Sequence, residues 1–315
     1  MVFWILCLIP LIGAQFILFF PNEKMNQIKY FSLSLSLITF GFNIYLIQYP
    51  LALGHWNWGQ IISWYSKYGI DWSVHVDGMS MSLLLLSTLL IPISILGSFN
   101  SINKHIKGFY YCILLLESAV IGVFITSNLW VFYLFWEMML IPMYFLIGVW
   151  GGKERIHASI KFILFTLAGS LIMLVGILSL GYLHLVEYGS WNFSIFNLSG
   201  LHLSSGIQNS LFICFFIAFA VKIPIVPFHT WLPDAHSEAP TAGSVLLAAV
   251  LLKMGLFGFI RICIPIFPLA CLSASFPISF LGGIGIIYGA LLAWSQKDIK
   301  RCIAYTPLPW VHWVN

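Results

Sequence analysis

The chain has 315 residues, of which 60% are hydrophobic and only 8% are charged. Soluble domains carry about 25% charged residues, so this composition excludes an ordinary soluble protein and predicts an integral membrane protein. The formal net charge of +4 includes no basic cluster interleaved with aromatic residues, which leaves nucleic-acid binding unsupported. The six cysteines lie singly, without a C-x-x-C pair, so no disulfide framework, iron–sulfur ligation or zinc site is indicated.

A transmembrane helix needs about 20 predominantly apolar residues, and such segments recur along the chain. We predict spans at residues 2–20, 30–49, 78–98, 109–126, 129–150, 160–183, 210–228, 242–262 and 276–294. The first apolar segment lacks a basic leader and a small-residue cleavage site, so we interpret it as a retained span rather than a signal peptide. The predicted fold class is an all-α polytopic membrane bundle of about nine helices, and residues after Lys300 are compatible with the start of a tenth.

Two links between spans are rich in aromatic residues. Residues 50–77 carry Trp56, Trp58, Trp64 and Trp72, a composition typical of an interfacial segment. Residues 186–205 mix aromatic and aliphatic side chains with polar ones, which predicts a segment lying in the interface rather than crossing the bilayer.

Basic residues are distributed unevenly between the two sides of the membrane. When links are assigned alternately, one side receives only Lys67 and Arg261. The other side receives Lys24, Lys29, Lys104, Lys107, Lys153, Arg155, Lys161, Lys297, Lys300 and Arg301. By the positive-inside rule, the amino terminus is expected to face away from the matrix or cytoplasm.

Four ionisable residues lie inside predicted spans: Glu117, Glu137, Lys222 and Lys253. A charge at the bilayer centre costs roughly 2.5–3.5 kcal/mol even on the gentler insertion scales. One interpretation is snorkelling or a structural ion pair within the bundle. The functional interpretation is a proton relay, because burial disfavours the charged form of each group and a nearby opposite charge restores it. We expect Glu137 to face Lys222, with Lys253 as the next station and Glu117 at most flanking this path.

The predicted seventh span is interrupted at Pro224 and Pro227, directly after Lys222. The prolines could merely kink the helix, but non-helical backbone beside a buried lysine favours a local water-filled cavity. His229 and His236 follow and are candidates for relaying protons, although a lone histidine is often a hydrogen-bonded core residue.

The other polar residues after the break are expected to play structural parts. We expect Asp234 and Glu238 to cap the next span or to face the interface. The glycine-rich segment 282–289 lacks a G-x-G-x-x-G spacing, and we interpret Gly285 and Gly289 as a helix-packing face. No P-loop, metal-ligand or nucleophile pattern is present, so no cofactor and no metal is expected in this chain.

Three motifs give the chain a family resemblance. FYLFWEMMLIPMYFLIGVWGG (132–152), LPDAH…APTAGSVLLA…LLKMG (232–255) and KDIKRCIAY (297–305) resemble the antiporter-like subunits of respiratory complex I, of the chain M or subunit 4 type. The likeness extends from IPLIGA at 9–14 to Tyr305, essentially the whole chain. More distant relatives of this family are subunits of multi-component cation/proton antiporters.

The resemblance implies a function and a set of residues. It implies a non-redox membrane-arm subunit of proton-pumping NADH:ubiquinone oxidoreductase, with NADH, FMN, iron–sulfur clusters and ubiquinone held by other subunits. It implies that Glu137 and Lys222 match the family's span-five glutamate and broken-helix lysine, and that Lys253 matches the central lysine of span eight. His229 and His236 match histidines on the hydrated axis.

The resemblance also implies a domain organisation and partners. We expect amino-terminal spans at 1–108, a first antiporter-like repeat of spans four to eight at 109–262, and the start of an inverted second repeat at 263–315. Expected partners are the other membrane-arm subunits, including neighbouring antiporter-like subunits, and membrane lipids, in the mitochondrial inner membrane or alternatively a bacterial plasma membrane.

The chain departs from the family after Tyr305. The family continues to about fourteen spans and usually has a histidine soon after the IAY motif, whereas here 306–312 read TPLPWVH and His312 is at best displaced. The sequence therefore resembles a carboxy-terminally truncated subunit, and three explanations stay open: one piece of a split subunit whose remaining spans come from a separate chain, a part of a longer chain, or an aberrant translation product. Two alternatives remain: a stand-alone cation/proton antiporter component, and a structural fragment without its own pumping path.

Overall fold

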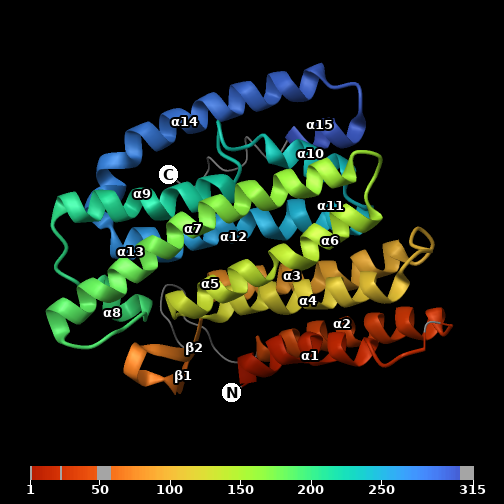
Figure 1. Cartoon of the computed structure of the whole chain (residues 1–315), viewed down its shortest axis with the longest axis horizontal. Helices are drawn as coiled ribbons and strands as arrows, with labels where there is room; N and C mark the ends of the chain where they lie inside the picture. The colour runs from red at the N-terminus through yellow and green to blue at the C-terminus, as the bar shows by residue number, and fades with distance from the viewer. Residues whose placement is uncertain (1, 22, 48–57, 306–315) are drawn as a thin grey trace.

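The computed structural model describes residues 2–21, 23–47 and 58–305. Its long helices run side by side between two ends of the molecule (Figure 1). One end, which we call the hairpin end, carries a β-hairpin (β1, β2) and the short helices α8 and α13; the other, the α10 end, carries α10 and α15. This arrangement is what a chain of membrane-crossing helices joined by short links produces.

The amino-terminal part consists of four long helices and the hairpin. Its elements are α1 (Val2–Ile17), α2 (Met25–Leu46), β1 (Trp58–Tyr65), the 3-10 turn η1 (Ser66–Tyr68), β2 (Ile70–Val76), α3 (Gly78–Ser98) and α4 (Ile106–Ile125). Helix α4 packs against α1, α2 and α3. Of its most apolar stretch 83% is buried, against 17% for α14 near the carboxyl end, so α4 is the centre of this part.

The middle and carboxyl-terminal parts form the rest of the bundle. They comprise α5 (Leu129–Met138), α6 (Leu140–Trp150), α7 (Arg155–Tyr188), α8 (Ile195–Ser199), α9 (Ser205–Lys222), α10 (Trp231–Glu238), α11 (Thr241–Leu246), η2 (Leu247–Leu251), α12 (Leu252–Gly258), η3 (Phe259–Cys263), α13 (Ile264–Ile266), α14 (Pro268–Ser295) and α15 (Ile299–Tyr305). Helices α5 and α6 form one span interrupted at Met139, and α11 to α13 form another that contains two π-helical turns, η2 and η3. We call this second composite helix, Thr241–Ile266, span eight.

The described helices confirm a polytopic helical membrane protein. Seven of them are long and apolar enough to cross a membrane. Two of these, Gly78–Ser98 and Leu129–Trp150, have the predicted bounds. The other five begin before the predicted residue; three of them also end after it, whereas Ile106–Ile125 and Ser205–Lys222 end before the predicted 126 and 228. The first two predicted spans are helical as α1, of 16 residues, and α2, but neither is among the seven. The total of nine spans therefore stays a prediction.

The aromatic-rich link before α3 contains the one pair of strands in the described residues, which the sequence analysis did not predict. Strands β1 and β2 pair antiparallel from Trp58↔Val76 to Tyr65↔Ile70, with an irregularity between Ser63 and Tyr65. The hairpin turns at Gly69, whose φ of 65° lies in the left-handed region that glycine adopts without steric cost. Trp56 lies outside the described residues.

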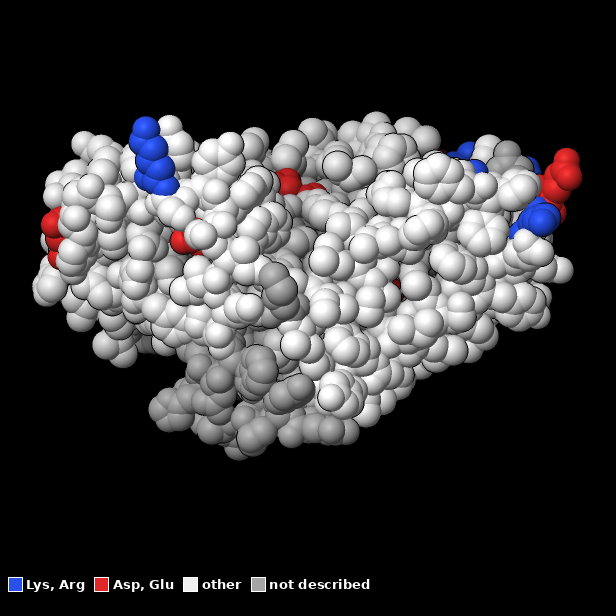
Figure 2. Space-filling model, turned by 90° about the horizontal axis from the view of Figure 1, so that it is seen from below, with Lys and Arg blue, Asp and Glu red and all other residues white. Residues whose placement is uncertain are grey.

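Few charged side chains lie on the face of the bundle that Figure 2 draws. Figure 2 shows one face of the molecule, where the visible Lys and Arg side chains lie toward the two ends and the broad area between them is almost entirely uncharged. Such a band is what contact with lipid requires, because a charged side chain at the bilayer centre is costly.

Candidate functional site

The predicted helix break lies directly after Lys222. Helix α9 ends at that residue, and the chain becomes helical again only at Trp231, so residues 223–230 connect two half-helices. The Ile225 amide donates to the carbonyl of Ala220 at 2.9 Å, and the indole Nε1 of Trp231 donates to the carbonyl of Val221 at 2.8 Å. The interruption therefore has its own hydrogen bonds, which fix the end of α9 and the lysine on it.

Lys222 is buried among aromatic rings. Its side chain is 1% exposed, and Nζ lies 5.4 Å from the ring centroid of Trp136 on α5 and 5.7 Å from that of Phe162 on α7. Rings at this distance attract a cation through their quadrupole. Nζ has no hydrogen-bond partner among the described residues. Two aromatic rings can therefore stabilise the charged form of this amino group, but no carboxylate of the described residues pairs with it directly.

Glu137 lies within electrostatic reach of this lysine, as expected from the sequence. It is half-buried near the end of α5, where the amide of Met139 donates to the carbonyl of Glu137 and interrupts the span. The carboxyl group lies near the hydroxyl groups of Ser170 on α7 and Tyr133 on α5 and within reach of the charge of Lys222, and its Oε1 has no hydrogen-bond partner among the described residues. The pair is not in direct ionic contact, so its interaction depends on what lies between the two groups.

Span eight approaches Lys222 closely but directs its own lysine elsewhere. A Cβ at Gly255 would press into Ile223 and come close to the Cβ of Lys222, so glycine is what allows α12 to pack on the end of α9. Lys253, two residues earlier, is exposed. The described residues therefore bring Glu137 and Lys222 together and leave Lys253 on another face.

The two histidines occupy separate positions after the break. His229 is buried and its ring stacks edge-on against Tyr288 of α14, with ring centroids 5.4 Å apart. His236 is buried on α10, near the charge of Lys300 on α15. In both rings Nδ1 has no hydrogen-bond partner among the described residues. The part of the two histidines in proton transfer stays a prediction.

The expectation that Asp234 or Glu238 caps span eight is wrong. The residue preceding α11 is Pro240, and no side chain caps the helix. Asp234 instead accepts from Lys161 Nζ of α7 at 2.6 Å, and Glu238 accepts from the amide of Glu154 at 2.9 Å. Both carboxylates thus attach α10 and the residues after it to the loop and helix of the neighbouring span, contacts across 70 or more residues that sequence spacing does not reveal.

Glu117 lies apart from this site. It is on α4, 1% exposed, and neither carboxylate oxygen has a hydrogen-bond partner among the described residues.

A second charged pair was also not predicted: Arg261 Nη1 of η3 lies 2.7 Å from Asp77 Oδ2, with each side chain 11% exposed. It joins span eight to the start of α3 at the hairpin end.

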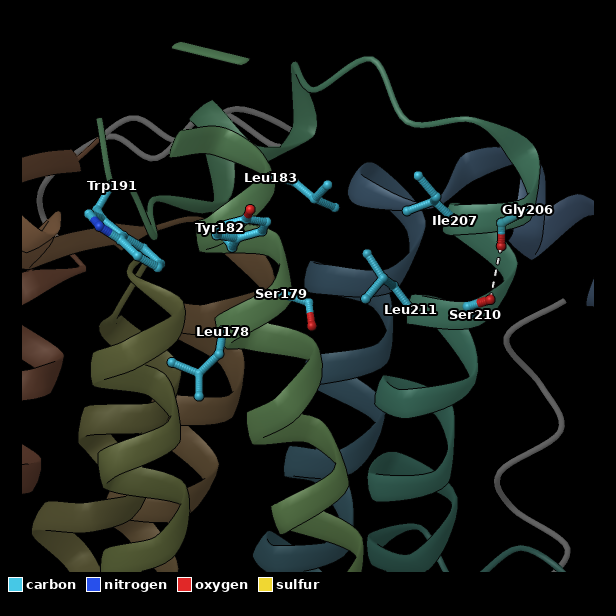
Figure 3. A pocket seen from close by; sticks show the side chains of 9 residues that line it. All are labelled: Leu178, Ser179, Tyr182, Leu183, Trp191, Gly206, Ile207, Ser210 and Leu211. Carbon is cyan, nitrogen blue, oxygen red and sulfur yellow. Dashed lines mark hydrogen bonds between the residues drawn. The ribbon is translucent and has the colours of Figure 1, made fainter. Parts of the chain in front are cut away.

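A large groove lies away from these charged groups. It is open, has a volume of about 660 Å³, and is bounded by α7, α9 and Trp191. Figure 3 shows its lining, in which Ser210 Oγ donates to the carbonyl of Gly206 at 3.0 Å. No Lys, Arg, Asp or Glu lines it, so it belongs to the lipid-facing surface rather than to the charged site. Among the described residues, no group of three or more His, Cys, Asp or Glu side chains could hold a metal ion.

Comparisons with known proteins give the chain a family. Residues 126–309 match the family described as NADH:quinone oxidoreductase/Mrp antiporter, TM. The chain is 41% identical over 311 residues to NADH-quinone oxidoreductase subunit M of Rickettsia prowazekii, covering 98% of this chain and 62% of the relative. It is 40% identical over 301 residues to NADH-ubiquinone oxidoreductase chain 4 of Chondrus crispus, covering 95% and 60%.

A solved structure shows the same architecture. A chain of respiratory complex I from Thermus thermophilus with bound NADH superposes with a TM-score of 0.86 at 29% identity, covering 99% of this chain and 63% of that chain. The present chain thus spans less than two thirds of the length of these relatives. The matched segment contains the helix break, Lys222 and Glu137, and on this basis the chain belongs to the NADH:quinone oxidoreductase/Mrp antiporter transmembrane family.

Proposed function

We propose that this chain contributes a proton-translocation path to the membrane arm of a proton-pumping NADH:ubiquinone oxidoreductase. The observation that carries the proposal is the buried amino group of Lys222 at a helix break, which lacks a hydrogen-bond partner among the described residues and lies within electrostatic reach of Glu137. Intramembrane ionisable residues at interrupted helices mark ion and proton paths in membrane proteins. Relatives named as subunits of such an oxidoreductase support the assignment.

The proposed mechanism is a change in charge pairing. When Glu137 is ionised and close, it favours the ammonium form of Lys222; when hydration or geometry weakens the pairing, the buried lysine releases its proton. His229 and His236 would pass protons between the α10 end and the lysine, and Lys253 would receive them. Electron transfer in other subunits would drive these changes, and NADH, FMN, iron–sulfur clusters and ubiquinone would reside there.

We further propose an orientation and an organisation. The α10 end, which carries most of the lysines and arginines of the links, would face the matrix or cytoplasm, with the amino terminus on the opposite side. Residues 109–262 would act as one antiporter-like repeat, with 1–108 beside it and 263–315 beginning the next. Other membrane-arm subunits, and a separate chain carrying further spans, would complete the assembly in the mitochondrial inner membrane. The orientation can be tested by measuring whether a protease added outside sealed organelles cleaves a tag at the amino terminus.

The test measures proton pumping and quinone reduction in sealed membranes that contain the assembled complex. Lys222→Ala and Glu137→Ala should each lower pumping and coupled electron transfer at least several-fold while the complex still assembles. Lys153→Ala and Glu154→Ala, both on exposed loop positions, are the matched controls and should behave as wild type. A normal proton-to-electron stoichiometry in both Lys222→Ala and Glu137→Ala would contradict the proposal.

Two other outcomes would point to different functions. Sodium- or potassium-dependent proton exchange by the purified chain, with no dehydrogenase subunits co-purifying, would identify an antiporter component, consistent with the second half of the family's description. Intact pumping after neutralising Lys222 and Lys253 together would identify a structural subunit.

A further inference from the structure

One face of α3 carries a buried row of serines. The four residues follow one another at spacings of seven, seven and four, which return to the same side of a helix, and each is at most 5% exposed: Ser80, Ser87, Ser94 and Ser98. Contacts at the two ends of the row show which helices the serine side chains face. Ser98 Oγ lies 3.0 Å from Tyr110 Oη of α4, and Arg261 Nη2 of η3 donates to Ser80 Oγ at 3.4 Å. The row therefore faces α4 and span eight.

Glu117 lies on the side of α4 that faces this row. It follows Tyr110 by seven residues and so shares its face of the helix. Because α3 and α4 run antiparallel with Ser98 opposite Tyr110, Glu117 lies opposite Ile91, about one helical turn from both Ser87 and Ser94. The carboxylate is 1% exposed and both its oxygens lack a hydrogen-bond partner among the described residues, as does Ser94 Oγ.

Helix packing alone accounts for the serines but not for the carboxyl group. Ser87 and Ser98 donate to carbonyls of their own helix, a common way of burying small polar residues between membrane helices. Glu117 has no such option, and a buried carboxyl without a donor costs several kcal/mol when ionised. A proton or bound water must therefore satisfy it, and a polar site with two to four partners can hold water.

Among the described residues, no ion pair involves Glu117, and the cations on the neighbouring helices are engaged elsewhere or exposed. On span eight, Arg261 is paired with Asp77 at the hairpin end and Lys253 is exposed. On α5, Glu137 faces Lys222, and α1 has no charged side chain. Of the remaining neighbours, α2 brings Lys29, which donates to the carbonyl of Phe99 near the α10 end, α6 brings no charged side chain, and β2 brings Asp71 and His75 at the hairpin end.

We propose that Glu117 and the serine row of α3 form a second proton-binding site, holding water between α3, α4 and span eight and separate from the Lys222 site. The carboxylate accepts one proton from a hydronium ion in this water, so that a carboxyl O–H bond forms as a hydronium O–H bond breaks, and the reverse step returns the proton to the same water. The row runs from Tyr110 to the Arg261–Asp77 pair, which directs the site toward the hairpin end. The part that this proton plays in pumping rests on the proposed function; its binding at Glu117 does not.

Infrared spectroscopy of the purified complex tests the site without requiring turnover. The wild type should show a carboxylic-acid C=O band that shifts on transfer to D₂O, which reports a protonated carboxyl in contact with exchangeable water. Glu117→Gln should lose this band, whereas Glu154→Gln, at an exposed position, should keep it. Ser94→Ala should shift the band and Ser82→Ala, exposed on the same helix, should not, which gives a second readout should Glu117→Gln assemble poorly. A band that persists in Glu117→Gln, or one that does not shift in D₂O, would overturn the proposal.

Proton pumping by the same variants separates this inference from the proposed function. Loss of the band together with a drop in pumping of about twofold or more in Glu117→Gln would support both. A band assigned to Glu117 with unchanged pumping in both Glu117→Gln and Glu137→Gln would support the site and contradict the proposed function. Reduced pumping in Glu137→Gln alone, without any band that depends on Glu117, would overturn the site and leave the proposed function standing.

Discussion

The amino group of Lys222 lies 5.4 Å from the centre of the Trp136 ring, one residue before Glu137 on the same helix. A single turn of α5 therefore supplies both the aromatic ring and the carboxylate that act on this lysine. The ring is fixed: Trp136 is 2% exposed and also contacts Phe132 and Phe219.

Replacing this ring should impair the site without removing any charge. A cation–π contact is worth about 0.5–2 kcal/mol, so Trp136→Leu is expected to lower proton pumping by roughly two- to thirtyfold, and Trp136→Phe by less. Trp294→Leu, at a position 88% exposed, is the control and should match wild type. Pumping and quinone reduction are compared in sealed membranes with equal amounts of assembled complex, and equal rates in Trp136→Leu and wild type would contradict the prediction.

Gly255→Ala should disturb the contact between span eight and the end of α9. The added methyl group would meet Ile223 and the stem of Lys222, and such overpacking typically costs about 1–3 kcal/mol. We expect a lower thermal unfolding temperature and reduced pumping. Gly283→Ala on α14 has nothing within 4 Å of the new Cβ and should change neither property; similar behaviour of the two variants would show that the close approach at Gly255 does not matter.

The Lys161–Asp234 ion pair should stabilise the position of α10 by a modest amount. The side chains are 26% and 32% exposed, so the coupling is expected to be at most about 1 kcal/mol and to weaken with salt. A double-mutant cycle with Lys161→Gln and Asp234→Asn, read by hydrogen exchange of the α10 amides, measures it. A coupling that is zero at low salt would remove this pair from the list of contacts that hold α10.

Asp77 has two separable roles at the start of α3. Its carboxylate pairs with Arg261, and Oδ1 accepts from the Ser80 amide at 2.8 Å as an N-cap. Asp77→Asn keeps the cap and leaves a buried guanidinium without its anion, a loss of about 3–5 kcal/mol. Asp77→Ala should cost about 1 kcal/mol more.

Denaturation of the purified complex compares these variants with Arg261→Met/Asp77→Asn. The double variant should regain part of the stability that Asp77→Asn loses, because no unpaired charge remains buried. Arg261→Met alone gives the cost of losing the arginine. If the double variant is less stable than Asp77→Asn by that same cost, the two residues do not act as a pair.

His75 should make stability depend on pH in the acidic range. Burial and the charge of Arg261 lower the pKa of His75, whose Nδ1 lies 2.7 Å from Ser127 Oγ. Since the unfolded chain then binds more protons than the folded one, the contribution is present above about pH 6.5 and is lost as the pH falls below that value. His75→Gln should flatten the fall of the unfolding temperature between about pH 7 and 5. His157→Gln, at an exposed position, should leave the curve as in wild type, and an unchanged slope in His75→Gln would refute the assignment.

Most helices could be predicted because membrane spans are set by length and apolarity alone. Gly78–Ser98 is bounded by Asp77 and a polar link, and the end of α9 at Lys222 follows from the two prolines behind it. The proximity of Glu137 to Lys222 was also expected, since few other partners exist for two charges in an apolar chain. Their role in proton transfer stays a prediction.

Contacts between distant segments could not be predicted in the same way. The hairpin was missed because residues 58–76 show aromatic enrichment without a clean alternation, and only its pairing with itself and with the α4–α5 link settles the conformation. The Lys161–Asp234 pair joins residues 73 positions apart, a separation that carries no local signal. The exposure of Lys253 likewise depends on how span eight is rotated, which composition does not determine.

Span eight contains two π-helical turns that change the direction of the side chains after them: η2 precedes Lys253 and η3 follows it. Each holds about one residue more than an α-helical turn, so η2 and η3 behave as two single-residue insertions absorbed by an otherwise regular helix. Residues after each turn face a direction that counting 3.6 residues per turn would not assign. Deleting one residue within Leu247–Leu251 would therefore convert η2 into ordinary helix and restore uniform hydrogen bonding. The same deletion would place every side chain from Leu252 onward, including Lys253, in a new direction relative to the residues before it.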